Sequence, residues 1–194
     1  MPSNNFPGPA LPIQLNRGKY TEPQSTENAI RYISRTRANE TRADELLLWG
    51  TSHGYIYPKS PEIVISEFLY IQKYYQQKGS QICHYVLQIS PDTCNRMNND
   101  IYTIGNYAVA CCQYFLYTLG HQSCFAIHNS ATGKLHIHFI INATNYRTGR
   151  KLRQYHKEVY HTIEKPMLDI LEPFIYTTGS NADFFEMGES ELTK

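Results

Sequence analysis

The chain has 194 residues, of which 41% are hydrophobic and 18% charged, and these proportions are typical of a globular protein with its own core. Its net charge of +1 gives no general attraction to polyanions. Since no apolar run reaches the length of a membrane span and the N-terminus lacks a secretory signal pattern, we expect a cytoplasmic protein. Five cysteines without C-x-x-C spacing indicate free thiols.

We expect three segments along the chain. Residues 1–20 hold four prolines within their first twelve positions, which predicts a flexible leader. Residues 21–180 form one folded domain, and residues 181–194 form an acidic tail. Basic residues outnumber acids between residues 134 and 165, a bias that fits a nucleic-acid contact or a solvated helix face equally well.

The first half of the chain predicts three helices and one strand. Residues 24–37 begin with hydroxyl side chains and an early glutamate, as helix N-termini do. Residues 60–79 combine serine and proline at the start, apolar residues at helical spacing and a closing glycine. Residues 81–90 form a strand that ends before Pro91, and residues 100–120 are apolar over the length of another helix.

The second half predicts a β-hairpin. Residues 123–129 and 134–142 are strands joined by a short turn that contains glycine. A second turn covers residues 145–151. A helix then starts at about Arg153 and is interrupted at Pro166, because proline cannot donate to the helical ladder. This order of elements predicts an α+β fold with a central, largely antiparallel sheet flanked by helices.

The second hairpin strand reads KLHIHFIIN and carries two histidines two positions apart. Alternate residues of a strand share a face. The face expected in the core carries Leu135, Ile137, Phe139 and Ile141. The opposite face, which we expect to be an exposed functional face, carries His136, His138, Ile140 and Asn142.

A third histidine, His128, lies on the first strand of the hairpin, within reach of His136 and His138. Three neutral imidazoles are a donor set for a divalent metal with open coordination positions. A metal held in this way can polarise a phosphoryl or carbonyl oxygen. Asn142 could orient the bound group. A lone histidine would be better explained as a partly exposed polar residue, but three together favour the metal site.

The stretches HNSATGKLHIHFIIN and NYRTGRKL resemble the third motif of conjugative relaxases, the DNA strand transferases of the HUH endonuclease superfamily. The similarity is to the class found in P-type mobilisation systems. The motif runs from one histidine through a polar turn to a histidine pair and an asparagine, and the matching residues are His128, His136, His138 and Asn142. NAIRYISRTR resembles the first motif, whose nucleophilic tyrosine falls on Tyr32, and HYVLQISPD resembles the second motif more faintly.

The resemblance implies site- and strand-specific DNA nicking and strand transfer at the transfer origin of a plasmid or integrative conjugative element. The intermediate would be a 5′-phosphotyrosyl link to Tyr32. The implied cofactor is a divalent metal, Mg²⁺ or Mn²⁺ first, with Zn²⁺, Ni²⁺ or Co²⁺ as alternatives. The expected partners are single-stranded DNA or an extruded hairpin at the origin, accessory relaxosome proteins and a coupling protein, without membrane insertion.

Two positions depart from the family pattern. An acid usually stands two residues after the first histidine, where this chain has Ser130. A serine usually stands in the second motif where this chain has Gln88. Both positions belong to the group that orients the metal ligand and assists proton transfer, and the candidates for these tasks are Asn142, His84 and Gln88.

Basic residues near the motifs are candidates for phosphate contacts. Tyr32 is flanked by arginines, whose charges suit a phosphate or a phenolate. Tyr20 is a local competitor among the 16 tyrosines. The expected DNA-binding residues are Arg31, Arg35, Arg37, Arg147, Arg150, Lys151 and Arg153.

Three other functions stay open on the sequence alone. A rolling-circle replication initiator or a transposase shares the metal chemistry but carries its tyrosine after the histidine pair, where Tyr155 and Tyr160 lie near Lys157. A non-catalytic DNA-binding derivative would explain the missing acid and serine. A three-histidine hydrolase acting on a small molecule would need no tyrosine.

Overall fold

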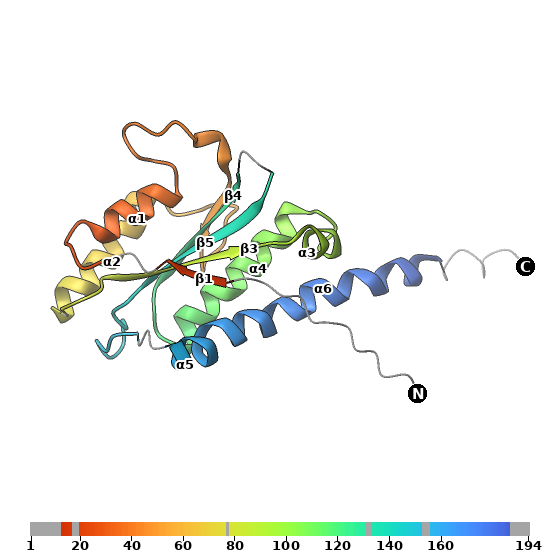
Figure 1. Cartoon of the computed structure of the whole chain (residues 1–194). Helices are drawn as coiled ribbons and strands as arrows, with labels where there is room; N and C mark the ends of the chain where they lie inside the picture. The colour runs from red at the N-terminus through yellow and green to blue at the C-terminus, as the bar shows by residue number, and fades with distance from the viewer. Residues whose placement is uncertain (1–12, 17–19, 77, 131–132, 153–155, 187–194) are drawn as a thin grey trace, which may run out of the picture.

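The computed structural model describes residues 13–16, 20–76, 78–130, 133–152 and 156–186. Its centre is a five-stranded antiparallel sheet in the order β1-β3-β5-β4-β2 (Figure 1). The strands are β1 (Ile13–Asn16), β2 (Leu46–Thr51), β3 (Ile82–Gln88), β4 (Ser123–Asn129) and β5 (Leu135–Asn142). The predicted α+β fold with a central antiparallel sheet is confirmed.

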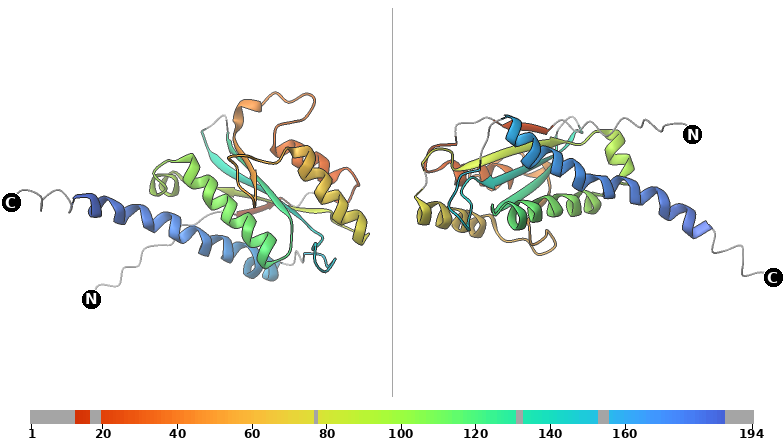
Figure 2. Two further views of the ribbon diagram at one scale, coloured as in Figure 1. Left: turned by 180° about the vertical axis from the view of Figure 1, so that it is seen from behind. Right: turned by 90° about the horizontal axis from the view of Figure 1, so that it is seen from below.

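Helices cover both faces of this sheet (Figure 2). One face is covered by α1 (Ser25–Ile33) and α2 (Pro61–Tyr75), and the other by α4 (Ile101–Gln113) and α6 (Lys165–Glu186). The shorter elements are η1 (Ala43–Glu45), α3 (Pro91–Arg96), the π-helical turns η2 (Tyr114–Thr118) and η3 (Tyr160–Glu164), and α5 (His156–Val159). None of the helices in the described residues is long and apolar enough to cross a membrane.

The alternation along β5 divides its side chains between two cores. Ile137, Phe139 and Ile141 join the core beneath α4 and α6, as predicted. Ile140 joins a second core beneath α1 and α2. The expectation that this second face is exposed is wrong, because His138 is only 5% exposed and Asn142 is fully buried. A sheet with helices on both sides needs apolar residues on both sides of its strands.

Four elements were not predicted from the sequence: the short η1, β1, β2 and α3. β1 pairs with β3 and lies within the expected leader of residues 1–20, so that expectation is wrong for Ile13–Asn16. β2 begins with four consecutive apolar residues and shows no polar–apolar alternation, which gives no clear strand period. α3 has the same start as α2, a serine N-cap followed by proline, but it is only six residues long.

The predicted interruption at Pro166 takes the form of a π-helical turn, η3, directly before α6. Pro166 lies in the first turn of α6, where proline is tolerated, but it cannot donate to the carbonyl of Thr162. The Tyr114 hydroxyl donates to that carbonyl instead, at 3.0 Å. The expected start of this helix at Arg153 lies outside the described residues.

Asn142 joins α2 to the end of β5. Its side-chain oxygen accepts hydrogen bonds from Gln72 Nε2 and the Thr144 amide, both at 3.2 Å. Its side-chain nitrogen donates to the Phe68 carbonyl at 3.2 Å and to Gln122 Oε1 at 3.0 Å. Every hydrogen-bonding position of this buried amide is therefore used by the fold.

We expect Asn142→Ala to lower the free energy of unfolding by about 2–4 kcal/mol, because it leaves several buried polar groups without a partner. Urea denaturation followed by circular dichroism measures this change. Asn39→Ala, at an exposed position, is the control and should have little effect. Equal stability of the two variants would contradict the anchoring role.

Candidate metal centre

The register of the β4–β5 hairpin brings the three predicted histidines together. His128 pairs directly with His136, and His138 pairs with Ala126. The ring centroids of the three histidines lie 4.7 to 5.4 Å from one another. One potential ligand nitrogen from each ring lies within 4.8 Å of the other two, so this cluster could hold a single metal ion.

Burial keeps the inner two histidines neutral. The pKa of His128 is lowered to about 4, mainly by burial; the nearby Arg35 guanidinium acts in the same direction, and the backbone hydrogen bond to the Ile33 carbonyl acts against it. Burial also lowers the pKa of His138 strongly, with the neighbouring histidines acting in the same direction. A neutral imidazole offers a lone pair, which is the form that binds a metal.

The hydrogen bonds of the three rings fit a metal ligand set. His138 Nε2 is buried and has no hydrogen-bond partner among the described residues. His136 bonds the Lys134 carbonyl through Nδ1 at 3.2 Å, which leaves Nε2 for a metal. His128 bonds the Ile33 carbonyl through Nε2 at 2.6 Å and Arg35 through Nδ1 at 3.2 Å. His128 must exchange one of these bonds to become a ligand.

Tyr32, on α1, lies against this cluster. Its ring makes an edge contact with His138, with the centroids 5.8 Å apart. The guanidinium groups of Arg35, Arg37 and Arg42 lie 5.0, 4.7 and 5.9 Å from its ring centroid. The predicted nucleophile therefore lies beside the histidines, surrounded by positive charge. Arg42 was missed by the sequence analysis because no motif includes it.

Arg35 is buried, which contradicts its expected role in phosphate contacts. It follows the last turn of α1 with a left-handed backbone, φ +55°, and the next amide, of Thr36, closes that turn on the Arg31 carbonyl. This conformation turns the side chain inward, where it forms ion pairs with Glu45 and Glu40. Arg35 therefore supports His128, and two unpredicted acids balance its charge.

The other arginines of the first motif differ in exposure. Arg31 forms salt bridges with Glu27 at 2.9 Å and with Glu62 at 3.1 Å, which neutralise much of its charge. Arg37 is exposed and donates to the Asn28 carbonyl at 3.2 Å. Arg37 is consequently the predicted DNA-binding residue of this group whose charge best serves a phosphate near Tyr32.

The second expected DNA-binding group lies at the opposite end of β5. Arg147 and Arg150 are exposed in the turn that follows the strand, and the end of the strand at Asn142 lies roughly 20 Å from His136. Lys151 is half-buried and donates to the Ser80 carbonyl at 2.7 Å. Arg153 lies outside the described residues. The structure thus separates the basic candidates into two distant groups.

Two of the three candidates for orienting ligands lie at the histidine cluster. His84 Nε2 contacts His138 Nδ1 at 2.9 Å, within the sheet interior. Gln88 pairs directly with His136 at the open end of β3. Asn142 is four residues beyond His138, roughly 14 Å along the strand, and its amide is fully used in anchoring α2. The expectation that Asn142 orients a metal-bound group is therefore wrong.

The competing tyrosine lies on the far side of the sheet. Tyr160 belongs to η3, which packs through Ile163 into the core beneath α4 and α6. The histidines face the other way, toward α1. Tyr155 lies outside the described residues.

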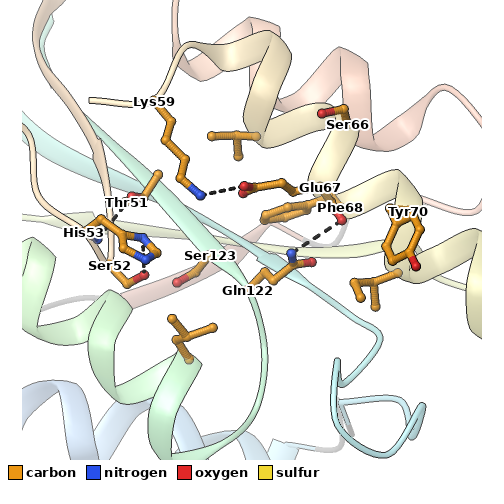
Figure 3. Close-up of a pocket in the computed structure, with 13 residues that line it drawn as sticks. Thr51, Ser52, His53, Lys59, Ser66, Glu67, Phe68, Tyr70, Gln122 and Ser123 are labelled. Carbon is orange, nitrogen blue, oxygen red and sulfur yellow. Dashed lines mark hydrogen bonds and ion pairs between the residues drawn. The ribbon is translucent and has the colours of Figure 1, made fainter. Parts of the chain in front are cut away.

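Two cavities differ in their relation to the cluster. A cavity of about 390 Å³ beside it is lined by Tyr20, Tyr32, Arg37 and His84, among others. A larger cavity of about 510 Å³ lies between α2, the end of β2 and the start of β4 (Figure 3). None of the predicted site residues lines the larger one, and its lysine, Lys59, is paired with Glu67.

We expect His136→Ala and His138→Ala each to lower the affinity for Mn²⁺ at least tenfold, because each removes one ligand nitrogen. The free energy of unfolding should fall more in His138→Ala than in His136→Ala, because His138 is buried and His136 is half-exposed. Titration calorimetry and urea denaturation measure the two effects. Metal affinity like that of the wild type in either variant would exclude the three-histidine site.

We expect the metal-free protein to lose stability as the pH falls from about 6.5 to about 4. The pKa values of His84 and His128 are lowered to about 4 by burial, so in this range the unfolded chain binds protons that the folded chain does not. Each histidine contributes up to about 1.4 kcal/mol per pH unit. Denaturation in EDTA at several pH values tests this, with His161→Ala as an exposed control. A flat profile would contradict the neutral buried cluster.

The comparisons with known proteins agree with the geometry. The family model described as Relaxase: MobA/VirD2-like, nuclease domain matches residues 22–172, well over half of the chain. No match was found among curated proteins. The matched segment contains Tyr32 and all three histidines of the cluster. The chain belongs to the MobA/VirD2-like relaxases, a family of DNA nicking and strand-transfer nucleases, and the predicted relaxase family is confirmed.

Proposed function

We propose that this protein nicks one DNA strand at a transfer origin and keeps the cut strand bound to Tyr32 as a 5′-phosphotyrosyl ester. The observation that carries this proposal is the edge contact between the Tyr32 ring and His138. His138 belongs to the three-histidine cluster, and the chain belongs to the relaxase family. The contact supports a reaction in which a tyrosine nucleophile and a set of metal ligands would act on the same phosphate.

In the proposed reaction, the Tyr32 phenolic oxygen attacks the scissile phosphorus. An O–P bond to tyrosine forms, the P–O3′ bond breaks, the phenol gives up its proton, and the leaving oxygen takes one up as a free 3′-hydroxyl. The reverse reaction rejoins the strand without another energy source. A divalent metal held by His128, His136 and His138 would neutralise charge on the phosphate oxygens.

The residues of the chain would contribute mainly positioning and charge. Arg37 and Arg42 lie next to the Tyr32 ring, where they can stabilise a phenolate and hold the phosphate. We propose single-stranded DNA or an extruded hairpin as the substrate, and Mg²⁺ or Mn²⁺ as the metal. Accessory relaxosome proteins and a coupling protein are the proposed further partners.

The position of Tyr160 argues against the replication-initiator alternative. That mechanism needs a tyrosine after the histidine pair, and Tyr160 lies on the opposite side of the sheet from the histidines. A non-catalytic derivative would not need a tyrosine and a complete histidine cluster in contact. The nicking assay below separates it from the proposed enzyme.

We expect Tyr32→Phe to abolish the covalent DNA adduct while DNA binding and stability stay nearly unchanged, because the ring packing is kept and only the nucleophilic oxygen is lost. The test incubates the protein with a labelled oligonucleotide library and Mn²⁺, followed by denaturing electrophoresis and mass spectrometry. Tyr160→Phe is the control and should form the adduct normally. An adduct on Tyr160 would replace this proposal with the replication initiator, and cutting without an adduct would assign the attack to water.

We expect Arg37→Ala to flatten the plot of log affinity against log salt by roughly 0.7 for single-stranded DNA, the effect of one lost phosphate contact. Fluorescence anisotropy with labelled oligo(dT) measures the slope. Arg147→Ala, at the other end of β5, should leave it unchanged. The reverse result would move the DNA footprint to the turn after β5.

A further inference from the structure

We propose that Tyr20 and His84 are positioning residues that set the tautomer of His138 in which Nε2 can bind a metal. The inference rests on the proposed role of His138 as a metal ligand. It assigns a task to two side chains that take no part in the proposed reaction.

The three side chains form a continuous hydrogen-bonded chain from the Tyr32 cavity into the sheet. The Tyr20 hydroxyl lies 2.9 Å from His84 Nδ1, and His84 Nε2 lies 2.9 Å from His138 Nδ1. His84 is 2% exposed, and Tyr20, which precedes α1, lines the same cavity as Tyr32. These hydrogen bonds therefore connect the segment before α1, which holds Tyr20, with β3 and β5, which hold His84 and His138.

The donors and acceptors of this hydrogen-bonded series can be arranged in two ways, and only one of them lets His138 Nε2 bind a metal. In the first, His138 donates from Nδ1 to His84 Nε2, and His84 donates from Nδ1 to the Tyr20 oxygen. His138 Nε2 then carries a lone pair, which is the form that can bind a metal. In the second, every donor and acceptor is reversed, and His138 Nε2 carries a hydrogen, so this nitrogen has no lone pair with which to bind a metal.

The surroundings of His138 Nε2 favour the first direction. This atom is buried without a hydrogen-bond partner among the described residues, so a hydrogen on it would have no acceptor. Ligating histidines generally donate their other N–H to a fixed acceptor, which raises ligand basicity and orients the ring. Here the acceptor would be His84, whose own N–H is held by Tyr20. Without the Tyr20 acceptor, His84 can carry its hydrogen on Nε2 and donate to His138 Nδ1, which moves the hydrogen of His138 to Nε2.

The experiment compares four variants with the wild type by titration calorimetry with Mn²⁺. His84→Leu removes the acceptor, and we expect a 10- to 100-fold loss of affinity. His84→Gln provides a side-chain oxygen that can accept from His138, so its affinity should recover to near that of the wild type. Tyr20→Phe should lose affinity to a smaller extent. Tyr114→Phe, which loses a hydroxyl bonded to a backbone carbonyl elsewhere, should be unchanged.

A second measurement reads the tautomer directly in the metal-free protein. Nitrogen-15 NMR of histidine-labelled protein should show His138 protonated at Nδ1 in the wild type and in His84→Gln, and a mixture of tautomers in His84→Leu and Tyr20→Phe. A merely structural role would lower stability without changing this ratio. Because Tyr20→Phe is a mild change, it keeps the test decisive if His84→Leu fails to fold.

Three results would overturn the proposal. They are wild-type Mn²⁺ affinity in His84→Leu or Tyr20→Phe, a tautomer ratio that does not change with these variants, and a wild-type His138 protonated at Nε2. Failure of the proposed nicking function can be distinguished from failure of this proposal. A protein that forms no Tyr32 adduct, but whose metal affinity and tautomer follow the expected pattern, would retain this inference and lose the proposed reaction.

Discussion

The antiparallel pairing of β4 with β5 is the constraint on which the site depends. It sets His128 opposite His136 and brings His138 beside both rings. A slip of one residue would turn every side chain of β5 over and exchange the histidines with Ile137 and Phe139. Because both faces of the sheet are covered by helices, such a slip would put polar rings into an apolar core, and the register is strongly specified.

Covering the histidine face has an electrostatic consequence. Buried imidazoles are more stable neutral than charged, and each buried nitrogen without a partner carries a cost unless the fold or a metal satisfies it. The chain satisfies His128 through the end of α1, where the Ile33 carbonyl and Arg35 both reach it. Arg35 is itself buried with Glu45, since an unpaired charge there would be strongly unfavourable. The C-terminus of α1 thus supports the candidate metal site as well as carrying Tyr32, the proposed nucleophile.

The arginines around Tyr32 differ in whether their charge is paired with an acid or exposed. Arg31 and Arg35 are neutralised by acids, whereas Arg37 remains exposed at the cavity beside the tyrosine ring. Charge that is exposed and close to a nucleophile can contact a phosphate, while charge locked in ion pairs contributes mainly to holding side chains in place. Proximity in sequence therefore says little about which arginine meets the substrate.

The main helices, the hairpin, the α+β class and the histidine set could be predicted from the sequence, because local periodicity and turn residues act over a few positions. The tyrosine came from the motif resemblance, since nothing local distinguishes one phenol among many. Tertiary structure alone decided that the histidine face is buried, that Arg35 turns inward, and that Asn142 anchors α2. It also decided that Tyr20 reaches His138 through His84. These outcomes depend on which helix covers which face of the sheet, and they join residues far apart in the chain, so no local pattern could contain them.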